Sequence, residues 1–226
     1  MIKKVCLVFL ALVVVLLAAA GVAWKLNGER WQQEYAAFKK TGAPVLMYHA
    51  VGLEEGADWP KTLIMKPELF EAHLKYLKEQ GYTIVTVAEL AERLQQGKSV
   101  DKYVALSFDD GYKNNHSVVL PLLQKYDAKG SFFVINRDIG DELHMNEQEI
   151  KELIAAGMEL GSHTYSHNPL AAIDEKYLVW ETDTSRYWLK KKFDGYIVRT
   201  LAYPNGSYND RVIDAAKKYG FYRALT

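Results

Sequence analysis

The sequence contains very little cysteine. Cys6 is the single cysteine among 226 residues, and it lies in an apolar run near the N-terminus. The remainder of the chain therefore forms no internal disulfide, and a metal site built on thiolates is excluded. Any metal held by the folded part must be bound by histidine, aspartate or glutamate side chains.

The chain also lacks an excess of charge of either sign. The 28 Lys and Arg residues balance 28 Asp and Glu residues, so the formal net charge is zero. A nucleic-acid-binding protein usually carries a basic surface, and this composition favours no such partner. Aromatic residues, by contrast, are well represented at 12 %. Their number suits either a sugar-binding cleft or ordinary core packing.

The N-terminus carries a long uncharged run. Residues 5–24 contain no charged side chain, and about 20 apolar residues suffice to span a bilayer as a helix. Lys3 and Lys4 precede this run, and basic residues on that side favour a cytoplasmic N-terminus with the remainder exported. We therefore predict a single-pass protein of the cell membrane whose folded part is extracytoplasmic.

A cleaved signal peptide is the alternative interpretation of the same run. Three consecutive alanines at positions 18–20 offer a cleavage site, and the protein would then be secreted. The run is long for a signal-peptide core, and Trp24 suits an interfacial anchor, so we favour an uncleaved anchor. The predicted organisation has three parts: a transmembrane anchor at 1–26, a polar stalk at 27–42 and a folded domain at 43–226.

Strand-like and helix-like segments alternate along the folded domain. This alternation is typical of parallel βαβ units and predicts an α/β fold, either barrel-like or doubly wound. In such folds the functional groups lie at the carboxyl ends of the strands. The predicted strands are 44–52, 82–86, 103–108, 130–135, 158–163, 199–204 and 221–226, and the predicted helices are 67–80, 87–97, 117–126, 146–156, 174–193 and 210–220.

Two adjacent carboxylates follow the apolar segment YVALSF at 103–108. Asp109 and Asp110 repel each other, and Asp is unfavourable in strands, so this pair carries a local energetic cost that indicates a function. Gly111 lets the chain turn directly after them, so both side chains can reach the mouth of a barrel. One carboxylate of such a pair can bind a metal while the other acts as a general base.

A second motif, GSHTYSH, places His163 and His167 four positions apart. A helical turn or a loop can present both imidazoles on one side. Two histidines and one carboxylate form a three-ligand catalytic metal site that leaves a position for water, and zinc in such a site lowers the pKa of that water to roughly 7. Either motif alone is weak evidence. Both together, each at the end of a strand, favour a metal site much more strongly.

These two motifs resemble a known family. SFDDGYKNN (107–115) is similar to the TFDDG motif, and GSHTYSH (161–167) to the H[ST]xxH motif, of the polysaccharide deacetylases, the NodB-like carbohydrate esterase family 4. The resemblance extends over residues 43–226. It implies a distorted (β/α)7 barrel of the NodB type.

The resemblance also implies a role for each motif residue. In the family the first Asp is the catalytic base, and the second Asp and both His bind a divalent metal, commonly zinc. Carried over to this sequence, Asp109 is the base, and the metal ligands are Asp110, His163 and His167.

The segment PVLMYHAV at 44–51 narrows the resemblance. It is similar to the start of the deacetylases that act on poly-β-1,6-N-acetylglucosamine, the intercellular adhesin. In that subgroup the barrel is circularly permuted, and the histidine that protonates the leaving amine comes from the N-terminal strand. His49 matches that histidine. Since no histidine follows His167, an unpermuted barrel would lack its general acid.

The third motif departs from the family pattern. TLAYPNGSYN at 200–209 resembles the YPYG variant of the adhesin subgroup, but no Arg directly precedes the proline. Asn205 replaces the usual tyrosine, whose backbone N–H helps to hold the oxyanion, and an asparagine has the same backbone group. The resemblance therefore assigns Tyr203, Pro204 and Asn205 to substrate and oxyanion binding.

The combined interpretation is a metal-dependent hydrolase that removes N-acetyl groups from N-acetylglucosamine units of a cell-surface polysaccharide. We predict a monomer that contacts this polysaccharide and, through its N-terminal helix, the membrane. Two alternatives stay open. One is the same chemistry on O-acetyl esters of a xylan-type polymer, and the other is an inactive module that binds polysaccharide.

Overall fold

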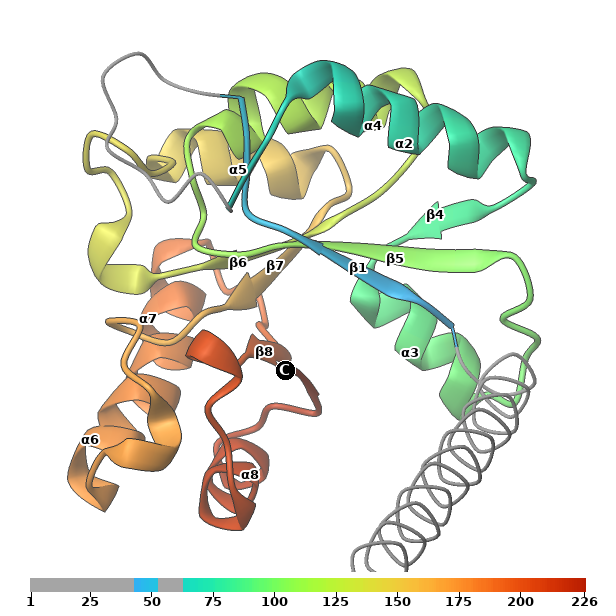
Figure 1. Ribbon diagram of the computed structural model, residues 1–226. Helices are drawn as coiled ribbons and strands as arrows, with labels where there is room; N and C mark the ends of the chain where they lie inside the picture. Colours follow the sequence, from blue (N-terminus) through green and yellow to red (C-terminus); the bar gives the residue numbers. More distant parts are fainter. Residues whose placement is uncertain (1–42, 53–62) are drawn as a thin grey trace, which may run out of the picture. The chain divides into compact units, whose positions relative to one another are not determined.

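A curled parallel sheet is the centre of the domain (Figure 1). The structure is a computed structural model that describes residues 43–52 and 63–226. The strands run in the order β1-β5-β6-β7-β8-β9, and β4 pairs with the first half of β5. The strands of this sheet are β1 (Val45–Tyr48), β4 (Thr83–Val85), β5 (Tyr103–Phe108), β6 (Ser131–Val134), β7 (Glu159–Ser162), β8 (Thr200–Ala202) and β9 (Arg223–Leu225).

The sheet remains open between its two ends. Among the described residues every pairing between its strands is parallel, and none joins β1 to β9. The sheet is therefore a half-barrel rather than a closed barrel. A separate parallel pair, β2 (Ala50–Val51) and β3 (Ile64–Met65), lies beyond the end of β1.

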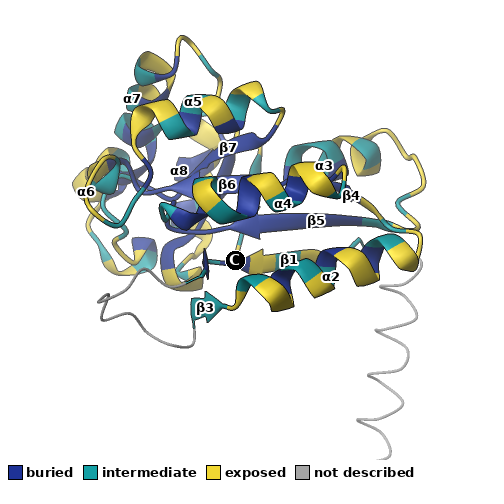
Figure 2. Ribbon diagram, turned by 90° about the horizontal axis from the view of Figure 1, so that it is seen from above, coloured by how far each residue is buried: buried dark blue, intermediate teal, exposed yellow. Residues whose placement is uncertain are grey.

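Helices follow most strands, as the alternating pattern predicts. Helices α2, α4 and α5 lie together over one side of the sheet, and their exposed outer faces contrast with the buried strands beneath them (Figures 1 and 2). The helices are α2 (Pro67–Glu79), α3 (Val87–Gln95), α4 (Leu120–Lys125), α5 (Glu147–Ala155), α6 (Glu175–Val179), α7 (Ser185–Lys192) and α8 (Asp210–Lys218).

The local sequence explains where helix α3 begins. The Thr86 hydroxyl accepts a hydrogen bond from the Glu89 N–H at 3.1 Å, and the Glu89 carboxylate accepts one from the Thr86 N–H at 3.0 Å. This reciprocal capping box satisfies two N–H groups that the first turn leaves without partners.

Three predicted elements are interrupted in the structure, and one of them, the predicted helix 117–126, begins with a π-helical segment at Asn115–Val119 before α4. The other two lie near the candidate site described below. The predicted helix 174–193 contains a wider π-helical turn at Trp180–Thr184, which separates α6 from α7. The predicted strand 44–52 breaks at His49, whose backbone carbonyl accepts a hydrogen bond from the Asn115 side chain at 3.0 Å instead of continuing the ladder.

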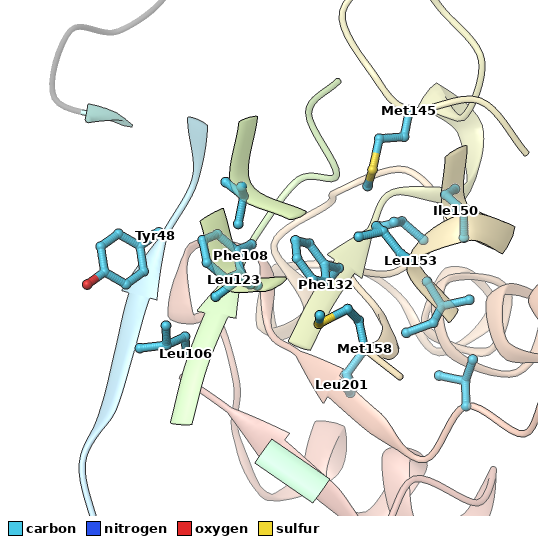
Figure 3. Packing of buried hydrophobic residues seen from close by; sticks show 14 of the residues in the cluster. Tyr48, Leu106, Phe108, Leu123, Phe132, Met145, Ile150, Leu153, Met158 and Leu201 are labelled. Carbon is cyan, nitrogen blue, oxygen red and sulfur yellow. The ribbon is translucent and has the colours of Figure 1, made fainter. Parts of the chain in front are cut away.

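The core lies between the sheet and its helices and is rich in aromatic rings. Phe108 of β5 stacks on Tyr48 of β1 and on Phe132 of β6, with ring centroids 5.4 and 4.8 Å apart (Figure 3). Phe70 of α2 meets Tyr48 and Phe108 edge-on. Complete burial of such side chains stabilises the fold by about 2 kcal/mol each, so this row fixes β1, β5 and β6 relative to one another.

The structure confirms the α/β class with a curled parallel sheet. None of the described helices has both the length and the apolar character needed to cross a bilayer. The predicted anchor at 1–26 and stalk at 27–42 lie outside the described residues. The membrane helix and the circular permutation of the barrel therefore stay predictions.

Candidate active site

The candidate site begins where β1 and β5 end side by side. These strands pair in parallel with Tyr48 opposite Phe108, so His49 and Asp109 leave the sheet together. Successive side chains of a strand point to opposite faces. The aromatic side chains therefore enter the helix-covered core, while Ser107 and the two residues after the strands line a pocket on the other face.

Neither carboxylate of the Asp109–Asp110 pair lies within the strand, which ends at Phe108. Asp110 has a φ of 71° and Gly111 a φ of 82°, so the chain turns through the left-handed region immediately after Asp109. This turn brings both carboxylates into the pocket, although in an uninterrupted strand they would point apart.

The two histidines of the second motif lie in a loop that follows β7. Thr164 has a φ of 69° and His167 a φ of 62°, and the Thr164 hydroxyl accepts a hydrogen bond from the His167 N–H at 3.1 Å. The ring centroids of His163 and His167 lie 4.7 Å apart. A loop, rather than a helical turn, therefore presents both imidazoles on one side.

Three potential metal ligands converge in the pocket. The Nε2 atoms of His163 and His167 lie 3.4 and 3.5 Å from Oδ1 of Asp110. One ligand atom from each of the three residues lies within 4.8 Å of the other two. Asp110 and His163 are buried, and His167 is partly exposed. The site thus has two well-buried donors and one donor at its rim.

The hydrogen bonding of His163 fits a metal ligand. Its Nδ1 donates to the backbone carbonyl of Ala202 at 2.9 Å, because a carbonyl oxygen only accepts. Nε2 therefore carries the lone pair of the neutral ring and faces the Asp110 carboxylate. Two electron-rich atoms at this separation require a proton or a cation between them. Two imidazole nitrogens and a carboxylate oxygen are a donor set that suits zinc.

The pKa directions also show a deficit of positive charge. Burial lowers the pKa of His163, but its hydrogen bond to Asp110 and the charges of Asp109 and Asp110 outweigh burial and raise it. The pKa of His167 is lowered, first by burial and then by the charge of His163. One positive charge is favourable in this cluster, and a second is not.

The adjacent carboxylates differ in their electrostatic surroundings. Burial tends to raise the pKa of Asp110, but the hydrogen bond and charge of His163 lower it overall. The pKa of Asp109 is raised, chiefly by burial. Oδ1 of Asp109 is buried and has no hydrogen-bond partner among the described residues. Asp110 therefore remains a carboxylate suited to binding a cation, while Asp109 has an oxygen available to accept a proton.

The pocket around these groups has a volume of about 300 Å³. His49 lies in its wall, and its charge acts on both Asp109 and Asp110. The lining residues are Val45, Met47, His49, Leu63, Ser107, Asp109, Asp110, His163, His167, Ala202, Tyr203, Asn205, Gly206, Leu225 and Thr226. The pocket therefore combines titratable polar groups with apolar side chains such as Val45, Met47 and Leu225.

The third motif forms one wall of the pocket. Tyr203 is buried and stacks on Tyr208 at 5.4 Å between ring centroids. Asn205 adopts a left-handed conformation, with φ 54° and ψ 23°, and lines the pocket. Pro204 is buried and is not among the lining residues. The structure thus brings two of these three predicted residues to the pocket surface.

Sequence reasoning missed some residues that support the site. Tyr112 hydrogen-bonds Asp110, and burial together with the Asp110 charge raises its pKa. The Ala202 carbonyl accepts a hydrogen bond from His163, and the buried Glu181 accepts one from the Ser166 N–H, next to His167. Tyr112 directly follows the DDG motif, so it was recognisable from its position. Ala202 and Glu181 are distant from the two motifs in the sequence, and only the fold brings them to the site.

Similarity to known proteins agrees with this geometry. The sequence model for polysaccharide deacetylases matches residues 96–224, more than half of the chain. YxkH of Bacillus subtilis is 33% identical over 192 residues, which cover 83% of this chain and 65% of that protein. A poly-beta-1,6-N-acetyl-D-glucosamine N-deacetylase of Staphylococcus aureus is 28% identical over 174 residues, which cover 71% of this chain and 60% of that protein.

Solved structures share the fold as well. The Streptococcus pyogenes deacetylase PplD, determined in complex with acetate, superimposes with a TM-score of 0.72 at 30% identity. The match covers 79% of this chain and 80% of that one. The present chain spans 65% and 60% of the lengths of the two curated relatives.

Proposed function

We propose, because this chain belongs to the polysaccharide deacetylase family, that it is a metal-dependent hydrolase acting on N-acetylglucosamine units of a cell-surface polysaccharide. One observation carries the proposal. Asp110, His163 and His167 converge in the same pocket as Asp109, whose buried Oδ1 lacks a partner among the described residues. The named activity of the Staphylococcus aureus relative supports an N-acetylated glucosamine polymer as the substrate.

The metal would be held by Asp110, His163 and His167, and zinc is the metal that this donor set suits best. When bound, such a cation polarises a carbonyl group and lowers the pKa of a bound water to roughly 7. The hydrogen bond from His163 to the Ala202 carbonyl would keep Nε2 directed at the cation.

We assign the proton transfers to two residues on neighbouring strand ends. Asp109 would accept a proton from the water that attacks the acetamide carbon, since Asp109 lines the pocket and none of the described residues donates a hydrogen bond to its Oδ1. His49 would donate a proton to the amine nitrogen as the C–N bond breaks. The products are acetate and a free amino sugar, which accounts for every atom of the amide and the water.

The remaining wall would bind the reacting acetyl group. The Asn205 turn would direct a backbone N–H towards the oxyanion, and Tyr203 would pack beside it, with Pro204 fixing the entry to the turn. We further propose a permuted NodB-type barrel, because His49 is supplied by the first strand of the domain. An extracytoplasmic location behind the N-terminal anchor remains our proposal from the apolar run at 5–24.

Acetate release tests this function directly. The full chain, purified in detergent, would be incubated with N-acetylglucosamine oligomers of β-1,6 or β-1,4 linkage, or with acetylated xylan, each with added zinc or with EDTA. We expect zinc-dependent release, and we expect Asp109→Asn to lower turnover about 10²–10⁴-fold while zinc content is unchanged. Asp101→Asn is the matched control, because it makes the same change at an exposed position before β5.

The outcomes separate the possible functions. Acetate release from acetylated xylan but not from the glucosamine oligomers would show that the enzyme hydrolyses an ester and not an amide. A folded, zinc-loaded protein that releases acetate from none of these polymers would contradict the proposed activity and leave a binding module. Full turnover by Asp109→Asn would remove Asp109 from the mechanism.

A further inference from the structure

A buried carboxylate lies behind the metal-binding loop and outside the pocket lining. Glu181 belongs to the π-helical turn Trp180–Thr184 and is 2% exposed. Among the described residues, no Lys, Arg or His forms a salt bridge with it, and the charge of Arg137 acts on it without a direct contact. A buried carboxylate is costly unless hydrogen bonds compensate for the lost water, so the partners of Glu181 should indicate its role.

Within the described part of the chain, all the hydrogen bonds that the Glu181 carboxylate accepts come from the segment around His167. Its Oε2 accepts from the Ser166 N–H at 2.8 Å, and its Oε1 accepts from the Asn168 side-chain amide at 2.9 Å. The Ser166 hydroxyl also donates to Oε1. Because Ser166 and Asn168 flank His167 on both sides, one carboxylate holds the two neighbours of a candidate metal ligand.

The conformation of this loop explains why such a support is needed. His167 and Thr164 both adopt left-handed backbone conformations, which are uncommon for residues other than glycine and are less common for Thr than for Asn, Asp or His. A residue in such a conformation persists when its surroundings over-determine it. The hydrogen bonds that Ser166 and Asn168 donate to Glu181 supply that constraint on both sides of His167.

The same helix also holds the other end of the loop. Ser185, four residues after Glu181, hydrogen-bonds the Ser162 hydroxyl at 2.8 Å and donates to Asn136 at 2.7 Å. Ser162 directly precedes His163. The widened turn therefore allows one helical segment to hold both ends of the loop that carries the two histidines, which gives the turn a physical purpose.

We propose that Glu181 is a positioning residue that holds His167 in its metal-binding orientation. The inference rests on the proposed function, since it requires that Asp110, His163 and His167 bind a divalent cation. Glu181 itself touches neither metal nor substrate. It restricts the conformations of His167 before the cation binds, so binding costs less conformational entropy.

Zinc affinity is the measurement that tests this role. The full chain in detergent would be stripped with EDTA, and its zinc Kd would be measured by competition with a chromophoric chelator. Groups that support metal ligands typically contribute 10–100-fold to metal affinity. We expect Glu181→Ala to weaken zinc binding by about that factor. Glu181→Gln has the same shape and retains one acceptor oxygen, so its loss should be smaller.

A matched control distinguishes positioning from general stability. Thr182 is the next residue of the same turn, is buried, and donates only to the Leu178 carbonyl of its own helix. Thr182→Val should leave zinc affinity unchanged. Hydrogen exchange at the Ser166 amide of the metal-free protein should be faster in both Glu181 variants and unchanged in the control.

Each outcome has a definite meaning. If the wild-type chain binds zinc and the folded Glu181→Gln and Glu181→Ala variants bind it equally well, Glu181 is only a structural contact and the inference is wrong. If Glu181→Ala does not fold, Glu181→Gln decides the question by itself. If the wild-type chain binds no divalent metal, it is the proposed function that fails first.

Discussion

Gly111, the residue after the two carboxylates, offers a sharp test of how the site is built. We predict that Gly111→Ala destabilises the protein and displaces Asp110. Two independent effects contribute. Gly111 has a φ of 82°, and a Cβ at this position would lie 2.9 Å from Cγ1 and 3.3 Å from Cα of Val134.

The expected magnitude is the sum of these two effects. An alanine in the left-handed region costs about 1 kcal/mol relative to glycine. The 2.9 Å contact with Cγ1 is closer than real Cβ atoms tolerate, and the 3.3 Å contact with Cα is tight and involves a backbone atom of β6 that cannot rotate away. Overpacking of this kind costs about 1–3 kcal/mol. The total is about 2–4 kcal/mol, a large part of the 5–15 kcal/mol typical of a folded domain.

Urea unfolding of the metal-free chain measures the loss, and a second substitution separates its parts. Val134→Ala removes Cγ1 but leaves the Val134 backbone in place. In the wild-type background it opens a cavity and should cost about 1–2 kcal/mol. In the Gly111→Ala background it should cost about 1 kcal/mol less, because it also relieves the overlap. Zinc affinity should fall in Gly111→Ala and recover only in part in the double variant.

Two results would refute this reasoning. If Gly111→Ala unfolds within about 0.5 kcal/mol of the wild-type free energy, neither the conformation nor the close contact matters as argued. If Val134→Ala has the same cost in both backgrounds, the overlap with Val134 is not felt, and only the conformational effect survives.

Three further predictions concern the scaffold. Burial raises the pKa of Tyr48 from 10.0 to about 12. Its contribution to stability is therefore complete below pH 10 and is lost as the pH rises to 12. In urea titrations the free energy of unfolding of the wild type, measured relative to Tyr48→Phe, should fall by about 1.4 kcal/mol per pH unit in that window. Glu159 is buried and accepts hydrogen bonds from Ala88, Ser131 and Thr200 at 2.5–2.9 Å. Glu159→Ala should therefore lower the free energy of unfolding by about 3 kcal/mol in the same assay. A decrease under about 1 kcal/mol would contradict a stabilising role for these hydrogen bonds. Asn146→Ala removes the cap of α5 and should lower stability by about 1 kcal/mol, which thermal unfolding would detect as a lower Tm.

Much of the fold could be predicted from local patterns. The apolar segment 103–108 coincides with β5, and Thr86 and Glu89 form the predicted capping box. These features depend on neighbours in the sequence, so sequence reveals them directly. The π-helical turn within the predicted helix 174–193 could not be predicted, because Glu181 and Ser185 of this segment contact a loop that is distant in the sequence.

The candidate site was predictable where strand ends supply its side chains. Asp110 and His163 follow β5 and β7, and parallel strands bring their carboxyl ends to one edge. The left-handed conformation of Asn205 was also within reach, since an Asn-Gly pair is a turn signal. The Ala202 carbonyl was not predictable, because every residue has a carbonyl and only the register of β7 and β8 selects this one.

The pairing of β1 with β5 makes the first strand intolerant of changes in length. Tyr48 faces the aromatic core, and His49 leaves the strand beside Asp109. Deleting one residue from β1 without shifting its pairing would exchange these two positions, since side chains alternate between the faces of a strand. The imidazole would then enter an apolar layer and the phenol would enter the pocket. A substitution in β1 changes one side chain on one face of the strand, whereas the deletion of one residue changes the core and the site together.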